Sequence, residues 1–319
     1  MKILMITGLT LPEVTEEELA EIYVASGEGE LELVHSNEDA QKHLEDAEII
    51  LGVVNREMFP KAKSLRWLHS TAAGADMLMY PEMVASDVVL TGEKGLVGDH
   101  LSDHAFALLL ALTRQLKRQI LEAPKWIRAE VRPHMLELSG FRLGVVGLGG
   151  TGRAVARRAK AFGMDVIAVD SEKVEQVPEV SELQGMDRFH DFLGRCNVVV
   201  VCCPLTKETR GLFNDAAFAA MQPSSYIVNV TRGPIIDDQA LLRALESGKI
   251  AGAGLDVVPQ EPLPAEHPFW KHPSVVLTPH TAGASQFRAR RNVRRFIENI
   301  KHYRAGEALE GEIDKNKGY

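Results

Sequence analysis

Three ionisable residues, Arg232, Glu261 and His280, each follow closely on a short apolar run that has the composition of a buried strand. An arginine offers a planar fork that binds a carboxylate at two points and polarises a carbonyl group. A histidine gives or takes a proton near neutral pH, and a carboxylate bonded to its other ring nitrogen fixes its tautomer. Together with a nicotinamide cofactor, these three side chains could reduce a 2-oxo acid.

Each of these residues also has an ordinary structural interpretation. Arg232 could lie in a solvated turn, Glu261 could be a surface acid, and His280 could be a histidine with purely structural hydrogen bonds. In an open parallel sheet, however, ligands bind outside the carboxyl ends of the strands. Because all three residues are predicted at such ends, the catalytic interpretation is favoured over three independent coincidences.

A glycine-rich segment predicts where a dinucleotide would bind. Residues 147–152, Gly-Leu-Gly-Gly-Thr-Gly, fit the pattern G-x-G-x-x-G, with a predicted strand at 142–146 before it and a helical pattern after it. In this pattern Gly147 permits the tight turn, Gly149 lets the backbone approach a pyrophosphate, and Gly152 lets the helix pack close to the sheet. The pyrophosphate would then lie on the N–H groups at the helix N-terminus. The alternative is a glycine-rich turn that binds nothing.

The strand after this segment ends at Asp170, where a carboxylate can accept hydrogen bonds from the ribose hydroxyls. The same charge would repel the 2′-phosphate of NADP. Two unit charges about 4 Å apart cost roughly 4 kcal/mol at an effective dielectric near 20. Ser171 and Glu172 supply no arginine to offset that cost, although Lys173 is close. The sequence therefore predicts NAD in preference to NADP.

The elements that must position these residues form two sets. Short apolar runs alternate with longer amphipathic segments, which is the pattern of βα units around parallel sheets and predicts an α/β fold. Residues 101–121 predict one long helix, 122–140 a loop-rich connection, and 293–303 an amphipathic helix. Strands are predicted at residues 2–7, 30–35, 48–53, 66–70 and 88–91, and then at 142–147, 165–170, 197–203, 226–231, 253–258 and 275–278.

Composition narrows the classes of partner. A chain of 319 residues suits two domains. With 45% hydrophobic and 25% charged residues it resembles ordinary folded domains rather than a disordered or fibrous protein. The 36 Lys and Arg against 44 Asp and Glu give a net charge of −8, which supplies no general attraction for nucleic acid or an anionic membrane. A small-molecule substrate is therefore expected.

Cysteine usage and apolar run lengths indicate the compartment. Cys196, Cys202 and Cys203 are odd in number and lie close together, which argues for a reducing compartment and against a disulfide framework. No second ligand cluster accompanies them, so no metal site is predicted. The longest apolar stretch, 105–112, is far shorter than the ~20 residues that cross a bilayer. We expect a cytoplasmic protein.

An ordered series of motifs extends over nearly the whole chain: residues 147–152 with Asp170, 203–206 with Thr209, 229–233, 254–257 with 261–263, and 267–270 leading to 278–280. This series closely resembles the D-isomer-specific 2-hydroxyacid dehydrogenase family, which includes glyoxylate and hydroxypyruvate reductases. The resemblance implies two Rossmann-like or flavodoxin-like domains with parallel sheets. An NAD-binding domain at 99–286 would be inserted into a substrate domain made of 1–98 and 287–319.

The resemblance also implies roles for individual residues. Arg232 would bind the substrate carboxylate and carbonyl, His280 would be the general acid and base, and Glu261 would orient His280. The backbone N–H groups of Ala73 and Gly74 would also hold the substrate carboxylate, beside Arg232 and His280. The implied cofactor residues are Gly147, Gly149, Gly150, Thr151, Gly152, Asp170, Cys202, Cys203, Pro204, Thr209, Thr231, Arg232, Asp256, His280 and Ala282. A homodimer is the usual state in this family.

The chain differs from the family's usual sequence at two places that bear on substrate choice. Asp103 stands where the family usually has glutamate, and the sequence of residues 91–95 is not the family's commonest one. We predict an NAD-dependent oxidoreductase that reduces a small 2-oxo acid, of the glyoxylate or hydroxypyruvate class, to the D-2-hydroxy acid. One alternative is an NAD(H)-sensing binding module like the family's corepressors. Another is a dehydrogenase of a different small anion, such as formate or phosphite.

Overall fold

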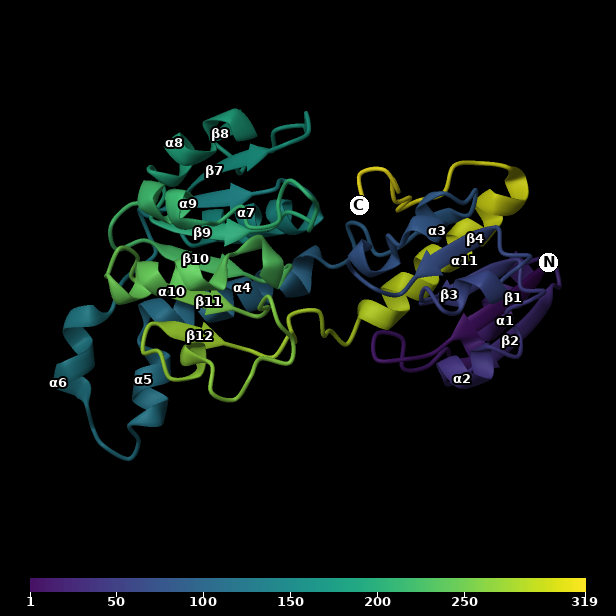
Figure 1. The fold of residues 1–319 in the computed structure, drawn as a ribbon, viewed down its shortest axis with the longest axis horizontal. Coiled ribbons are helices and arrows are strands. Elements are labelled where there is room, and N and C mark those ends of the chain that lie inside the picture. Colours follow the sequence, from purple (N-terminus) through teal and green to yellow (C-terminus); the bar gives the residue numbers. More distant parts are fainter. The chain divides into compact units, whose positions relative to one another are not determined.

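The computed structural model describes residues 1–319, and the chain divides into two compact units (Figure 1). Unit 1 contains Met1–Val97 and Ala284–Tyr319, and unit 2 contains Gly98–Gly283. Each unit is built on one parallel sheet with helices, so the predicted α/β class with two parallel sheets is confirmed. None of the helices combines the length and the apolar character that a membrane crossing requires.

Unit 1 has a five-stranded parallel sheet in the order β2-β1-β3-β4-β5. Its strands are β1 (Lys2–Ile6), β2 (Glu30–Val34), β3 (Ile49–Gly52), β4 (Trp67–Ser70) and β5 (Val89–Thr91), and all five were predicted. Its helices are α1 (Glu16–Ala25), α2 (Asn37–Ala40), α3 (Pro81–Val84) and α11 (Arg288–Ala305). Alternate side chains of β1 enter different clusters, Ile3 and Met5 on one face and Leu4 and Ile6 on the other. Both faces of the sheet are therefore buried.

The predicted C-terminal amphipathic helix is confirmed as α11, which packs on the sheet of unit 1. Val293, Phe296 and Ile300 are fully buried on its apolar stripe. The ring of Phe296 lies 5.2 Å from that of Trp67 in β4, and the ring of Tyr303 stacks on the same tryptophan at 5.5 Å. The last part of the chain is thus a structural element of the unit that the first 97 residues begin.

Unit 2 has a seven-stranded parallel sheet in the order β12-β11-β10-β9-β6-β7-β8, which is the doubly wound Rossmann arrangement. Its strands are β6 (Arg142–Val146), β7 (Asp165–Asp170), β8 (Glu182–Gly185), β9 (Val198–Val201), β10 (Tyr226–Asn229), β11 (Gly252–Leu255) and β12 (Val275–Leu277). Its helices are α4 (Gly98–Thr113), α5 (Leu116–Leu121), α6 (Arg128–Val131), α7 (Gly150–Ala161), α8 (Phe189–Leu193), α9 (Asp215–Ala220) and α10 (Asp238–Glu246). The strand order reverses between β6 and β9, where such folds bind dinucleotides.

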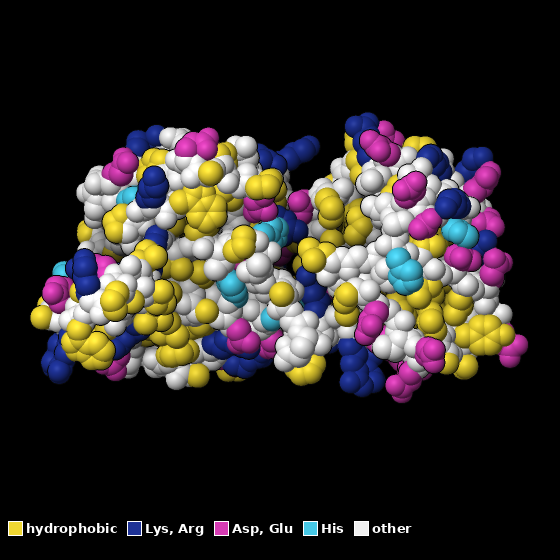
Figure 2. Space-filling view, turned by 90° about the horizontal axis from the view of Figure 1, so that it is seen from below, with side chains coloured by type: hydrophobic (Ala, Val, Ile, Leu, Met, Phe, Trp, Pro, Cys, Tyr) yellow, Lys and Arg dark blue, Asp and Glu magenta, His cyan; other side chains and the backbone are white.

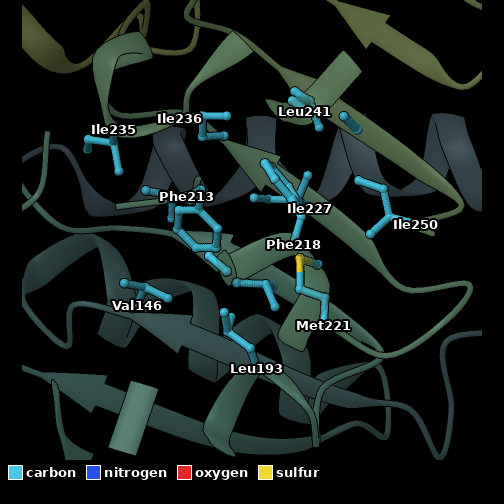
Figure 3. Packing of buried hydrophobic residues seen from close by; sticks show 14 of the residues in the cluster. Val146, Leu193, Phe213, Phe218, Met221, Ile227, Ile235, Ile236, Leu241 and Ile250 are labelled. Carbon is cyan, nitrogen blue, oxygen red and sulfur yellow. The ribbon is translucent and has the colours of Figure 1, made fainter. Parts of the chain in front are cut away.

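One face of this sheet is held by a large buried cluster. Figure 3 shows side chains of Phe213, Ile227 and Leu241 among those that converge there from a loop, from β10 and from α10. Phe213 and Ile227 have no exposed surface. Because Ile227 belongs to β10, the strand that precedes Arg232, this packing fixes one of the strands from which the site residues project.

Strand β8 was not predicted. Its sequence, Glu-Leu-Gln-Gly, has no apolar run, because it pairs only with β7 at the edge of the sheet and its side chains are half-buried or exposed. A pattern search for buried strands has no signal for such a segment. The loop-rich connection predicted at 122–140 likewise contains a short α-helix, α6, and a short 3₁₀ helix at Arg132–His134.

The single long helix predicted over 101–121 is wrong. Helix α4 ends at Thr113 and α5 begins at Leu116. Gln115 between them has a left-handed backbone, with φ of 55°, and its side-chain amide donates to the carbonyl oxygen of Leu112 at 3.2 Å. The apolar spacing continues across this break, and neither glycine nor proline marks it, so the sequence pattern did not reveal it.

Candidate active site

The glycine-rich loop joins β6 to α7 at the point where the strand order reverses. Gly147 has a left-handed φ of 95°, and a Cβ there would lie 2.8 Å from the backbone of Cys203. A Cβ on Gly152 would lie 2.1 Å from the carbonyl oxygen of Gly147. Neither position therefore tolerates a side chain. The turn between β6 and α7 brings together the predicted cofactor residues Gly147, Gly149, Gly150, Thr151 and Gly152.

The same loop has room for a pyrophosphate. A Cβ built on Gly149 would meet no atom within 4 Å, so the backbone there is open to close approach. Gly149 is also the N-cap of the twelve-residue helix α7, and no side chain caps the helix N–H groups. Exposed N–H groups at a helix start attract anions. The residues present therefore fit a dinucleotide.

Asp170 lies at the end of β7, beside this loop. Its carboxylate accepts hydrogen bonds from the backbone N–H groups of Leu148, at 2.7 Å, and Glu172, at 2.8 Å. Arg153, in the first turn of α7, donates to the carbonyl oxygens of Leu148 and Glu175. The sequence reasoning named Lys173 as the nearby cation and missed Arg153, although this arginine directly follows the glycine-rich segment.

The predicted adenosine residues follow β9, the neighbour of β6. Cys202 donates its backbone N–H to the carbonyl oxygen of Val146 at 2.8 Å, and the Thr209 hydroxyl donates to that of Pro204 at 2.7 Å. Burial raises the pKa of the Cys203 thiol to about 12 and that of the Cys202 thiol further still. Both thiols are therefore protonated at neutral pH and are not nucleophiles.

Arg232 follows β10 in a turn that Asn229 holds. The side chain of Asn229 donates to the carbonyl oxygen of Arg232 at 2.9 Å and accepts from the N–H of Thr231 at 3.0 Å. A Cβ on Gly233 would lie 1.9 Å from the backbone of Val258, so this turn packs directly against the one after β11. Asn229 is fully buried, and the sequence reasoning quoted it only as part of a motif.

His280 and Glu261 are in direct contact. The Nδ1 atom of His280 lies 2.6 Å from Oε2 of Glu261, and Oε1 of Glu261 accepts from the N–H of Val258 at 3.0 Å. An ionised carboxylate only accepts hydrogen bonds, so Nδ1 of His280 carries a proton toward it. Nε2 is then the ring nitrogen that can exchange a proton with a ligand. The His280 side chain is 47% exposed, which leaves it accessible.

Asp256 follows β11 and is buried beneath the His280 turn. Its side chain has no exposed surface, and its carboxylate accepts hydrogen bonds from the N–H groups of Thr281, at 2.9 Å, and Ala282, at 2.8 Å. Burial alone would raise the pKa of Asp256, but hydrogen bonds from His104, Thr278 and these two N–H groups outweigh it and lower the pKa to about 2. Asp256 is therefore a buried carboxylate that stays ionised.

The loop of residues 71–76, which contains Ala73 and Gly74, belongs to unit 1. Arg288 donates to the carbonyl oxygen of Thr71 at 3.3 Å and forms an ion pair with Glu93, at 2.6 Å. Glu93 is 2% exposed. Glu93, within the uncommon sequence of residues 91–95, is thus a buried carboxylate that pairs with Arg288, the arginine that contacts this loop.

Asp103, the other place where the chain differs from the family's usual sequence, pairs with Arg158. Oδ1 of Asp103 lies 2.7 Å from Nε of Arg158, which links α4 to α7. The Asp103 side chain is 68% exposed. Its observed contact is an exposed helix–helix ion pair.

The doubly wound sheet carries a glycine-rich loop at the point where its strand order reverses, and ionisable residues at the carboxyl ends of its strands. These features define a class of protein, the oxidoreductases that use a nicotinamide dinucleotide. The chain matches the family model for the D-isomer specific 2-hydroxyacid dehydrogenase NAD-binding domain over residues 106–282, which is more than half of its length. It belongs to the D-isomer specific 2-hydroxyacid dehydrogenase family, as the sequence motifs predicted.

Named relatives agree with this assignment. A glyoxylate reductase of Thermofilum pendens is 34% identical over 262 residues, which cover 78% of this chain and 76% of that protein. Among solved structures, an NADPH-dependent glyoxylate/hydroxypyruvate reductase from Sinorhizobium meliloti, in complex with NADP and sulfate, has a TM-score of 0.83 at 27% identity and covers both chains fully. A D-isomer specific 2-hydroxyacid dehydrogenase from Xanthobacter autotrophicus, in complex with NADPH, has the same TM-score and identity over 99% of each chain.

Proposed function

We propose that this chain reduces a small 2-oxo acid of the glyoxylate or hydroxypyruvate class to the D-2-hydroxy acid, with NADH as the reductant. One observation carries the proposal: the neighbouring strands β10, β11 and β12 place Arg232, Glu261 and His280 at the same carboxyl edge, with His280 and Glu261 2.6 Å apart. The relatives named as glyoxylate reductases support this substrate class.

Unit 2 would hold the cofactor and unit 1 would be the substrate domain. The glycine loop would bind the pyrophosphate and Asp170 the adenosine ribose, with Cys202, Cys203, Pro204 and Thr209 around the adenosine. Thr231, Arg232, Asp256, His280 and Ala282 would lie on the nicotinamide side. When bound, the cofactor supplies the hydride.

The chain's own residues would supply the proton and the charge stabilisation. Arg232 binds the substrate carboxylate and polarises the carbonyl, so that negative charge developing on the carbonyl oxygen is stabilised. Nε2 of His280 donates a proton to that oxygen. Glu261 keeps the ring in the required tautomer. The N–H groups of Ala73 and Gly74, which make no hydrogen bond within the chain, would be further donors to the substrate carboxylate.

A panel of substrates tests the proposal. Initial rates of NADH oxidation should be highest with glyoxylate or hydroxypyruvate and lower with pyruvate and 2-oxoglutarate. Hydroxypyruvate should yield the D-isomer of glycerate in a chiral product assay. Formate and phosphite should not support NAD reduction. Turnover of either anion in preference to all four 2-oxo acids would contradict the assignment.

We further propose a preference for NAD over NADP, which rests on Asp170. The Asp170 carboxylate and a 2′-phosphate about 4 Å apart would repel each other by roughly 4 kcal/mol. Even half of that repulsion would weaken the binding of NADP relative to NAD by about thirtyfold. Arg153 and Asp170 both form hydrogen bonds with the backbone of Leu148, and the positive charge of Arg153 offsets part of this repulsion. We expect kcat/KM to be about tenfold higher with NADH than with NADPH.

Variants at these two positions separate the two charges. Asp170→Ser should narrow the preference to within about threefold, because the repulsive charge is gone. Arg153→Gln should weaken NADPH use further while leaving kcat/KM for NADH within about threefold of the parent. Parallel rate measurements with both cofactors check this. A parent chain that uses NADPH better than NADH would overturn the preference.

We also propose that two copies of the chain associate through α5 and the segment that follows it. Ile120 and Leu121 are each 71% exposed and Trp126 is 91% exposed. Figure 2 shows hydrophobic side chains on the surface at that end of unit 2. A patch of this kind is typical of an interface, and a two-fold dimer would cover it on both copies.

Light scattering after size exclusion checks this proposal. The parent chain should have twice the chain mass of 35.1 kDa, and Trp126→Glu should reduce it to the single-chain value. Leu9→Glu is the matched control, because Leu9 is fully exposed in unit 1 and its loss should leave the mass unchanged. A parent chain that is monomeric at micromolar concentration would exclude the interface.

A further inference from the structure

A second histidine of unit 2, His104 on α4, lies next to the buried carboxylate of Asp256. Its Nε2 atom is 2.8 Å from the hydroxyl oxygen of Thr278 and 3.2 Å from Oδ1 of Asp256. The Thr278 hydroxyl donates to that same Oδ1 at 2.6 Å. A hydroxyl has one proton to give, so Thr278 accepts a hydrogen bond from Nε2 of His104. The three side chains form a directed chain of donors that ends on the carboxylate.

The carboxylate in turn holds the peptide groups that follow His280. Besides the N–H groups of Thr281 and Ala282 on its side chain, Asp256 accepts the N–H of His280 on its own backbone carbonyl at 2.7 Å. Three consecutive backbone N–H groups are thus fixed to one residue. The turn that carries His280 is therefore built around Asp256.

This turn needs external support. His280 has a left-handed backbone with φ of 55°. That conformation is unfavourable for a residue with a Cβ, so it persists only where the surroundings impose it. A buried charge is likewise tolerated only when hydrogen bonds replace the water that it loses. Among the side chains that provide those bonds, His104 is the one that comes from a helix outside the strand-end turns.

We propose that His104 is a positioning residue for the general acid: through Thr278 and Asp256 it holds the His280 turn in its left-handed form. It acts on His280 through these residues rather than on the substrate. The inference rests on the proposed function for its effect on turnover, whereas its effect on the turn is independent of any reaction. Displacing a reacting group by about 1 Å costs on the order of a hundredfold in rate, which sets the scale expected here.

Matched variants test this proposal. His104→Leu fills the space without a donor, and we expect kcat to fall by about 10- to 100-fold while the dissociation constant for NADH stays within about threefold. Thr278→Val should have a similar effect. His104→Gln retains an N–H donor at the corresponding position and should restore kcat to within about fivefold. Thr113→Val, which removes another buried hydroxyl from α4, should change neither quantity.

Hydrogen exchange gives a readout that does not depend on turnover. The backbone N–H groups of Thr281 and Ala282 should exchange at least about tenfold faster in His104→Leu and Thr278→Val, and at the parent rate in His104→Gln and Thr113→Val. If His104→Leu does not fold, Thr278→Val and His104→Gln decide the outcome. Unchanged exchange in Thr278→Val, or a slow His104→Gln, would overturn the positioning role. A parent chain that reduces no 2-oxo acid would instead overturn the proposed function and leave the exchange test standing.

Discussion

Replacing His280 by alanine is expected to lower kcat for glyoxylate or hydroxypyruvate reduction by about a thousandfold. General acid catalysis by a positioned side chain contributes about 10²–10⁴ in rate, and Nε2 of His280 is the nitrogen left to donate once Glu261 holds Nδ1. The dissociation constant for NADH, measured by fluorescence, should change by less than about threefold, because the dinucleotide is held chiefly at the glycine loop. Steady-state kinetics with both substrates provide the measurement.

Two further variants define the role of the pair. Glu261→Gln keeps a hydrogen-bond partner for Nδ1 but removes the charge that stabilises a protonated ring, so we expect a smaller loss in kcat, about 10- to 100-fold. His190→Ala removes an exposed histidine on α8 of the same unit and should leave the kinetics unchanged. A His280→Ala enzyme with the parent kcat would show that His280 is a structural histidine.

Replacing Arg232 by leucine is expected to lower kcat/KM for the 2-oxo acid by about a thousandfold. The variant loses both the paired hydrogen bonds to the substrate carboxylate and the stabilisation of charge on the carbonyl oxygen, which alone is worth about 10²–10³ in kcat. KM should therefore rise while kcat falls. The turn itself should survive, because Asn229 holds it through backbone atoms of Thr231 and Arg232.

Arg232→Lys tests the geometry of the fork. Lysine keeps the positive charge but lacks the planar pair of donors, so its kcat/KM should lie between those of the parent and the leucine variant. The control is Arg243→Leu on α10, which removes an exposed arginine paired with Asp215 and should have no kinetic effect. If the Arg232→Leu variant has the KM and kcat of the parent chain, Arg232 has no role in substrate binding or catalysis and only lies in a solvated turn.

Much of the fold could be predicted from the sequence, because parallel strands that are buried on both faces consist of short apolar runs. The run Val198–Val201 and its neighbours in unit 2 carry that signal, and so do the strands of unit 1. Where burial is partial the signal disappears, as at the polar edge strand β8. The break after Thr113 was equally invisible, since one left-handed residue, Gln115, interrupts an apolar spacing that otherwise continues.

The candidate site was predictable where one local rule applied. Glycines at fixed positions and ionisable residues just past strand ends can be found by reading along the chain. The residues that support them cannot: His104 and Thr278 are 174 positions apart, and Glu93 and Arg288 are 195 apart. Such pairs depend on tertiary packing and leave no periodicity or short motif.

NADH consumption by the purified chain, measured with excess glyoxylate or hydroxypyruvate alongside the equilibrium binding of NADH, tests the central claim most directly. If the chain is a 2-oxo acid reductase, many equivalents of NADH per chain should be oxidised, and the D-isomer should form from hydroxypyruvate. Tight NADH binding without oxidation beyond one equivalent, on either 2-oxo acid, would contradict the claim and favour an NADH-sensing module.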